Sequence, residues 1–150
     1  MSCGKLHSIE TFGAVDGPGI RTVFFLHGCP ARCIYCHNPD SWAVESNECI
    51  TIEKTVHIAK RGKPYYGKEG GVTFSGGEPL DTSGTWIDEF TKEAIEQSQL
   101  LLLDIKHTDP EQFKKITGVE QERLLQIIEL ANNAEKQVWV RQVIVPGLND

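Results

Sequence analysis

The stretch TVFFLHGCPARCIYCHNPDSW, residues 22–42, joins a short apolar run to a loop that carries three cysteines. Residues 22–27 are β-branched, aromatic and aliphatic, a composition that favours a buried β-strand. Cys29, Cys33 and Cys36 follow within eight residues and lack the periodicity of one helix face, so a loop can turn all three thiols toward one centre. The stretch therefore predicts a strand that ends in a metal-binding or redox loop.

Strands and helices alternate along the rest of the chain. We predict further strands at residues 71–75, 99–106 and 137–145, and helices at residues 50–62, 85–98 and 109–133. Thr51 is the expected N-cap of the first helix, and Gly118 is expected to break the last one. Such alternation predicts an α/β fold with a parallel sheet of about four strands and right-handed crossovers, in a single domain over residues 1–150.

Composition and charge exclude several classes of function. The chain of 150 residues has a net charge of −6 without long runs of either sign, which argues against nucleic acid as a ligand. It has no apolar segment long enough to cross a membrane and no secretory leader, so we expect a cytoplasmic protein. Five cysteines make a poor disulfide framework, and Cys3 and Cys49, which match no motif, are expected to be free thiols.

Polar segments gather at the ends of the predicted strands. They are the cysteine loop itself, SGGEP at residues 75–79, DIK at residues 104–106 and RQVIVPG at residues 141–147. Because the carboxyl ends of parallel strands meet at one edge of the sheet, these segments are expected to form one ligand-binding edge.

The three cysteines are compatible with more than one metal centre. A structural zinc site needs a fourth protein ligand, for which His37 is a candidate, although it lies directly beside Cys36. An iron–sulfur cluster with three cysteine ligands leaves one iron open for a substrate and fits the spacing better. Three core cysteines without a metal are the remaining alternative.

The cysteine spacing and the motifs around it resemble those of the radical S-adenosylmethionine superfamily. DGPGIR (residues 16–21), the cysteine loop, SGGEP, LDTSG (residues 80–84), LLDIK and VWVRQVIVPG occur in the order found in glycyl-radical-enzyme activases, and the pyruvate formate-lyase type is the most similar. The resemblance runs from about Ile9 to Asp150. Without the resemblance, DGPGIR reads as a tight entry turn to the first strand.

The resemblance implies a set of site residues. Cys29, Cys33 and Cys36 would bind a 4Fe-4S cluster, and the residues expected to bind S-adenosylmethionine are Tyr35, His37, Gly76, Gly77, Glu78, Asp104, Ile105, Lys106 and Arg141. The alternatives without a binding role are an ordinary strand-to-helix turn at SGGEP, a solvated strand end at DIK and a surface position for Arg141.

The resemblance also implies the chemistry and the partners. Flavodoxin or ferredoxin would supply an electron that cleaves S-adenosylmethionine to a 5′-deoxyadenosyl radical, and this radical would generate a glycyl radical on pyruvate formate-lyase. Several relatives with other partners carry a cysteine-rich insertion between the cysteine loop and the GGE turn, where this chain has only Cys49. An activase of anaerobic ribonucleotide reductase is the nearest alternative.

The chain departs from this family in two places. SGGEP and LDTSG are fused across Leu80 and Asp81, so about one βα unit is absent, and the sequence stops shortly after VPG. We therefore expect an incomplete, shortened partial (β/α) barrel of the radical S-adenosylmethionine type. A second hypothesis for the function is an impaired remnant that binds only the iron–sulfur cluster.

Overall fold

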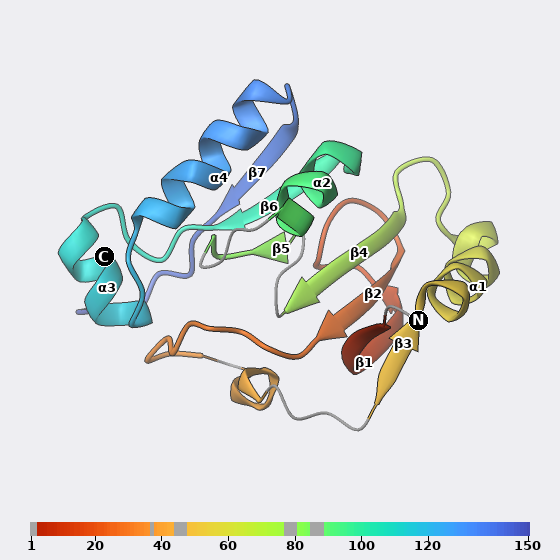
Figure 1. The fold of residues 1–150 in the computed structure, drawn as a ribbon, viewed down its shortest axis with the longest axis horizontal. Coiled ribbons are helices and arrows are strands. Elements are labelled where there is room, and N and C mark those ends of the chain that lie inside the picture. Colours follow the sequence, from red (N-terminus) through yellow and green to blue (C-terminus); the bar gives the residue numbers. More distant parts are fainter. Residues whose placement is uncertain (1–2, 37, 44–47, 77–80, 85–88) are drawn as a thin grey trace.

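The fold is α/β and is built on one mixed β-sheet (Figure 1). The computed structural model describes residues 3–36, 38–43, 48–76, 81–84 and 89–150. The strands are β1 (Cys3–Gly13), β2 (Arg21–Leu26), β3 (Cys49–Thr51), β4 (Gly71–Gly76), β5 (Asp81–Thr82), β6 (Leu100–Asp104) and β7 (Gln137–Arg141). The helices are α1 (Ile52–Gly62), α2 (Glu89–Gln97), α3 (Pro110–Thr117) and α4 (Glu122–Asn133), with short 3-10 helices η1 (Pro39–Trp42) and η2 (Lys63–Tyr65).

The strands follow the order β3-β1-β2-β4-β5-β6-β7 within the described residues. Neighbours from β2 through β7 pair in parallel, whereas β1 is antiparallel to both β2 and β3. The four predicted strands correspond to β2, β4, β6 and β7, and their parallel direction is confirmed. The expectation of a sheet with parallel strands alone is wrong, because β1 and β3 add an antiparallel edge that the alternation of strands and helices did not indicate.

The fused SGGEP and LDTSG motifs produce a very short strand. β5 has two residues, and a single pair, Ser75 with Asp81, joins it to β4. The bounds of β4 and β5 leave four sequence positions between them, whereas a crossover between parallel neighbours normally takes a dozen or more residues. Strand pairing in the middle of the sheet is therefore short. β5 pairs with β6 at two positions, Asp81 with Leu102 and Thr82 with Leu103.

The helices begin and end at residues whose chemistry explains the boundaries. The Thr51 hydroxyl accepts a hydrogen bond from the Lys54 amide at 3.3 Å, which confirms the predicted N-cap of α1. Gly118 has a φ of 76° and ends α3, so the predicted break between α3 and α4 is also confirmed. Residues 85–88 of the predicted second helix lie outside the described residues, and α2 is seen from Glu89.

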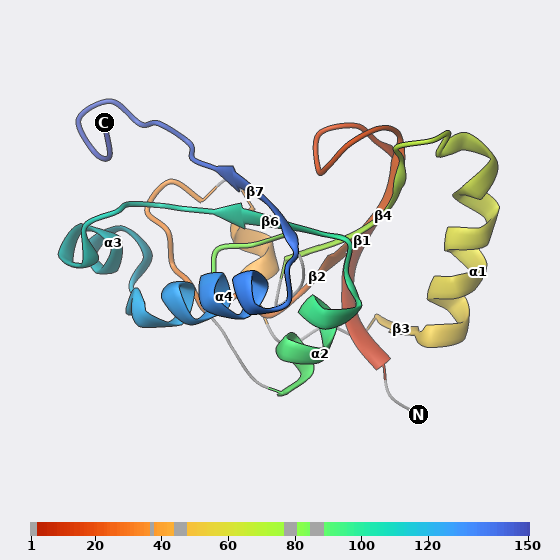
Figure 2. The ribbon, with the colours of Figure 1, turned by 90° about the horizontal axis from the view of Figure 1, so that it is seen from above.

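Two separate hydrophobic clusters lie on either side of the short strand β5. The larger one packs α2, α3 and α4 against β6 and has Phe113, Leu103 and Ile127 at its centre. The smaller one joins β1, β2 and β3 through Leu6, Phe24 and Ile50. Figure 2 shows α2 and α4 together beside β6, with α1 at the far end of the sheet. Contacts that cross between the two parts therefore matter for the shape of the whole chain.

Arg21 fastens the DGPGIR turn at the amino end of β2, opposite to the cysteine loop. The residue is only 6% exposed, and its side chain donates hydrogen bonds to the Pro18 carbonyl (3.1 Å from Nε) and the Thr73 hydroxyl (2.6 Å from Nη1). The Thr73 hydroxyl donates in turn to the Asp16 carbonyl at 2.8 Å. Burial lowers the pKa of the Arg21 guanidinium, while Asp16 and Tyr66 oppose the shift. These contacts give the turn a structural role.

Two further features bear on the sequence expectations. Cys49 is disulfide-bonded, so the prediction of a free thiol at this position is wrong. A long apolar helix of the kind that crosses a bilayer does not occur among the described residues.

Candidate functional site

The cysteine loop leaves the carboxyl end of β2 and is held from two sides. The amides of Gly28 and Cys29 both donate to the Ser41 carbonyl of η1, at 2.8 and 3.3 Å. On the other side, the Arg32 amide donates to the Thr117 carbonyl at 2.8 Å and the Ile34 amide to the Ile116 carbonyl at 3.0 Å. The loop thus satisfies carbonyl groups in the last turn of α3 and bridges the two parts of the sheet.

The three loop cysteines are half-buried and are not joined in disulfides. Burial raises the pKa of the Cys33 thiol most, the Lys106 charge opposes this, and Cys29 and Cys36 raise it further. Across the residues that the structure describes, no three His, Cys, Asp or Glu side chains gather closely enough to hold a metal ion.

The donor set fits an iron–sulfur cluster. Three cysteines within eight residues of one loop, none of them joined in a disulfide, can each supply one thiolate. Thiolates are the ligands that iron–sulfur clusters take from proteins, and three of them leave one iron for another ligand. The nearby Lys106 charge also favours the thiolate form of Cys33.

A charged group stands beside the loop at the carboxyl ends of β6 and β7. The Asp104 carboxylate accepts a hydrogen bond from Lys106 Nζ at 3.2 Å and another from Arg141 Nε at 2.8 Å. The Lys106 side chain is 14% exposed, and those of Asp104 and Arg141 are about twice as exposed. Asp104 is thus a counter-ion that Lys106 and Arg141 share at this edge of the sheet.

Tyr35 connects this charged group to the cysteine loop. Lys106 Nζ lies 5.8 Å from the centre of the Tyr35 ring. The Tyr35 hydroxyl is buried, and within the described part of the chain it makes no hydrogen bond of normal geometry. Burial raises the pKa of the phenol most, and the nearby Lys106 charge opposes the shift. Asn149 lies near enough to lower this pKa without reaching hydrogen-bond geometry.

Asn149 is a buried residue at this edge that the sequence did not single out. Its side-chain amide donates to the carbonyls of Val143 at 2.8 Å and Lys106 at 3.2 Å, and its oxygen accepts from the Val145 amide at 2.7 Å. These bonds fold residues 143–149 against the end of β6, where a longer strand was expected. An asparagine after a Pro-Gly turn is the one signal that could have pointed to it.

Gly76 ends β4 at the same edge, beside the last residue of β2. Its φ is 72°, and a side chain there would place Cβ 2.5 Å from the Leu26 carbonyl oxygen, so only glycine fits. Ile105 lies between the two charged residues, and its amide donates to the Arg141 carbonyl at 2.9 Å. The predicted site residues His37, Gly77 and Glu78 lie outside the described residues.

His27 is a second residue that the sequence did not assign to the site, and it is half-buried. It follows β2 directly, its ring meets the His7 ring edge to face at 5.0 Å, and its amide donates to the Lys5 carbonyl. Among the described residues, its buried Nδ1 atom has no hydrogen-bond partner. His27 therefore connects the cysteine loop to β1 and retains an unused polar atom.

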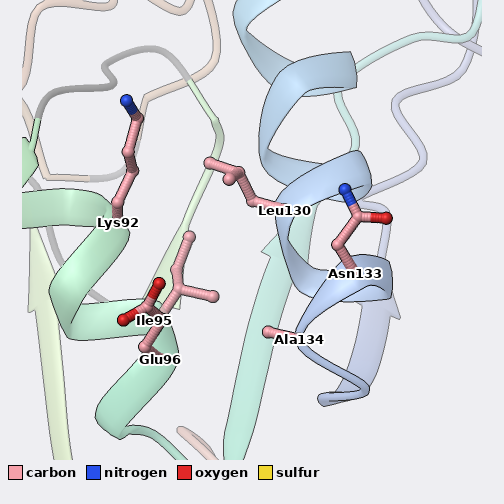
Figure 3. Close-up of a pocket in the computed structure, with 6 residues that line it drawn as sticks. All are labelled: Lys92, Ile95, Glu96, Leu130, Asn133 and Ala134. Carbon is pink, nitrogen blue, oxygen red and sulfur yellow. The ribbon is translucent and has the colours of Figure 1, made fainter.

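A small hollow among the described residues lies away from this edge. It lies between α2 and α4, has a volume of about 170 Å³, and is lined by Lys92, Ile95, Glu96, Leu130, Asn133 and Ala134 (Figure 3). None of the six is a predicted site residue, and the hollow is smaller than typical ligand pockets. The sheet edge remains the candidate site.

Known proteins identify the family. A family model described as a 4Fe-4S single cluster domain matches residues 15–139. A pyruvate formate-lyase-activating enzyme from Clostridium pasteurianum is 40% identical over 173 residues, which cover all of this chain and 72% of the relative. Proteins of the same name from Staphylococcus epidermidis and Staphylococcus aureus are 37% and 36% identical over 180 residues, with the same coverage.

The lengths of these alignments also bear on the fused motifs. The match to the Clostridium pasteurianum protein spans 173 residues although this chain has 150, so the relative has additional residues within the aligned region. This agrees with an internal deletion. The family model and the full-length identity of 36–40% together show that the chain belongs to the pyruvate formate-lyase-activating enzymes, a family of radical S-adenosylmethionine activases.

Proposed function

We propose that this protein is an activase that generates a glycyl radical on pyruvate formate-lyase by reductive cleavage of S-adenosylmethionine. The observation that carries the proposal is the meeting of two segments at one sheet edge: the cysteine loop after β2 and the charged group after β6, with Lys106 facing the Tyr35 ring. Relatives named for the same activity align with the whole chain. Ligands of parallel α/β sheets bind at this kind of edge.

The cofactors follow from the cysteines and the family. Cys29, Cys33 and Cys36 would hold a 4Fe-4S cluster. Bound together, the cluster and S-adenosylmethionine supply the electron transfer and the 5′-deoxyadenosyl radical that removes hydrogen from a glycine of pyruvate formate-lyase.

The protein side chains bind and orient the cofactor. Lys106 presents a positive charge to the carboxylate of the methionine part, and Asp104 holds this lysine and Arg141 in fixed positions. The Tyr35 ring and Ile105 shield the edge from water. Gly76 allows the backbone to approach the ligand, and the proposal extends to Gly77, Glu78 and His37.

The finer points of fold, partner and location are also proposals. The parallel strands β2 and β4 to β7, with the site at their carboxyl ends, support a single shortened (β/α) partial barrel over residues 1–150. Flavodoxin or ferredoxin is the proposed electron donor, and the cytoplasm is the proposed compartment. The net charge of −6 and the lack of long runs of either sign in the sequence support a protein that binds neither nucleic acid nor membranes.

A specific observation favours a second candidate function. The relatives have more residues than this chain in the aligned region, and the short β5 strand lies in the middle of the sheet. An impaired protein that binds the cluster without cleaving the cofactor is therefore the main alternative. Because relatives that align with the whole chain are named for pyruvate formate-lyase, an activase of anaerobic ribonucleotide reductase is a weaker candidate.

Anaerobic reconstitution with iron and sulfide tests the proposal. The reduced protein is examined by electron paramagnetic resonance with and without S-adenosylmethionine, and 5′-deoxyadenosine is measured by chromatography. The proposal expects a cluster signal that changes with the cofactor, together with 5′-deoxyadenosine formation. A Cys33→Ser variant is the control that should lose both. A cluster signal that is the same with and without S-adenosylmethionine would support the impaired protein. Zinc bound in place of iron would refute both candidates.

A further inference from the structure

Arg32 makes an unusual set of contacts within the cysteine loop. One terminal nitrogen, Nη1, donates hydrogen bonds to the carbonyls of Cys29 at 2.7 Å and Ala31 at 2.9 Å. The guanidinium carbon lies 5.0 Å from the centre of the Trp42 ring, which belongs to η1. A single side chain thus holds the backbone of the first half of the loop and anchors it on the segment that follows the loop.

The backbone of the same residue extends this connection to α3. The Arg32 amide donates to the Thr117 carbonyl, and the next loop contact, from Ile34 to Ile116, lies two residues further on. α3 packs in the larger hydrophobic cluster, whereas β2 packs in the smaller one. Arg32 therefore stands where the loop joins the two parts of the molecule.

We propose that Arg32 is a positioning residue for the iron–sulfur cluster: it shapes the loop before the cluster binds and keeps a fixed positive charge beside the bound cluster. This inference rests on the proposed function, because it concerns the cluster that the same loop would hold. The first part of the inference, that Arg32 shapes the loop, concerns the cluster-free protein and can be tested without the cluster.

The fixed charge has a defined effect on the redox equilibrium. Three thiolates already give the cluster a negative environment, and reduction adds one more negative charge. A neighbouring cation stabilises the reduced form more than the oxidised form, so it raises the midpoint potential. A lysine would keep the charge, but it lacks the planar guanidinium that stacks on the Trp42 ring and holds Nη1 at the two carbonyls. The variants Arg32→Lys and Arg32→Gln therefore separate shape from charge.

Hydrogen–deuterium exchange of the cluster-free protein tests the shaping of the loop. We expect exchange at the amides of residues 28, 29 and 31–34 to be about tenfold faster in both variants. Arg32→Gln loses the charge-assisted bonds to the loop carbonyls, and Arg32→Lys loses the stacked guanidinium that holds the donor at these carbonyls. Arg61→Gln on α1, at the far end of the sheet, makes the same charge change and should leave these amides unaffected (Figure 1). Unchanged exchange in Arg32→Gln would overturn this half of the proposal.

A redox titration of the reconstituted protein, followed by electron paramagnetic resonance, tests the charge. The midpoint potential should be lower in Arg32→Gln than in the unaltered protein, and Arg32→Lys should recover most of the difference. Equal potentials in all three proteins would overturn the second half. If the unaltered protein takes up no cluster, the proposed function fails and the charge effect fails with it, whereas the exchange experiment still decides whether Arg32 shapes the loop.

Discussion

Replacing Arg21 by methionine should destabilise the protein strongly, although Arg21 lies at the edge of the sheet opposite to the cysteine loop. Methionine has a similar length but no donors, so the Pro18 carbonyl loses its partner and the Thr73 hydroxyl loses the donor that lies 2.6 Å away. Gly17 packs against the same guanidinium and adopts a φ of 129°, which shows how closely the turn fits this side chain.

The size of the effect follows from the bonds that are lost. Arg21 donates four hydrogen bonds, two of them to the Pro18 carbonyl and a long one of 3.5 Å to the Glu69 carbonyl. Hydrogen bonds to charged groups contribute about 1.5–3 kcal/mol each, and removal of the buried charge offsets a large part of their loss. We therefore expect the free energy of unfolding to fall by about 3 kcal/mol, a large share of the roughly 5–15 kcal/mol typical of a domain. With a urea dependence of about 2 kcal/mol per molar, the unfolding midpoint should fall by about 1.5 M.

Urea unfolding of the cluster-free protein, followed by tryptophan fluorescence, measures this change. Arg21→Lys keeps the charge but not the forked donors, so it should lose most of the same stability. Arg61→Met, on the exposed surface of α1, is the matched control and should shift the unfolding free energy by less than about 0.5 kcal/mol. If Arg21→Met unfolds at the same urea concentration as the control, the buried contacts do not fasten the turn and our reasoning is wrong.

Three further changes test other parts of the structure. Asp104→Asn leaves Lys106 and Arg141 without a common counter-ion, so the melting temperature should fall as for a loss of about 1 kcal/mol; an unchanged value would mean that solvent screens the group. Asn149→Ala removes three hydrogen bonds and should speed amide exchange at residues 143–149, whereas a local effect confined to the mutated residue would contradict the packing against β6. Phe113→Ala should cost about 3–5 kcal/mol in urea unfolding because the ring is fully buried, and a cost below 1 kcal/mol would contradict the position of this residue in the larger cluster.

Local sequence patterns predicted the regular elements well wherever nearby residues determine them. The apolar runs that became β2 and β6 are short, β-branched or leucine-rich and flanked by turn residues. Thr51 and Gly118 act through bonds and backbone angles within their own turns, so their roles were visible without tertiary structure. In contrast, β1 was missed because its place depends on pairing with β2 and β3, and its charged and polar residues obscure the strand pattern.

The sequence by itself determined the spacing of the three cysteines, the order of the motifs and the alternation of strands and helices, because these depend on residues close together in the chain. Tertiary structure alone decided that Asp104 binds both Lys106 and Arg141, and that Arg21 lies at the opposite edge from the cysteine loop. It also decided that the Asn149 side chain donates a hydrogen bond to the Lys106 carbonyl. The physical reason is that strand register and the burial of polar groups are set by pairings between distant segments, which a local pattern does not contain.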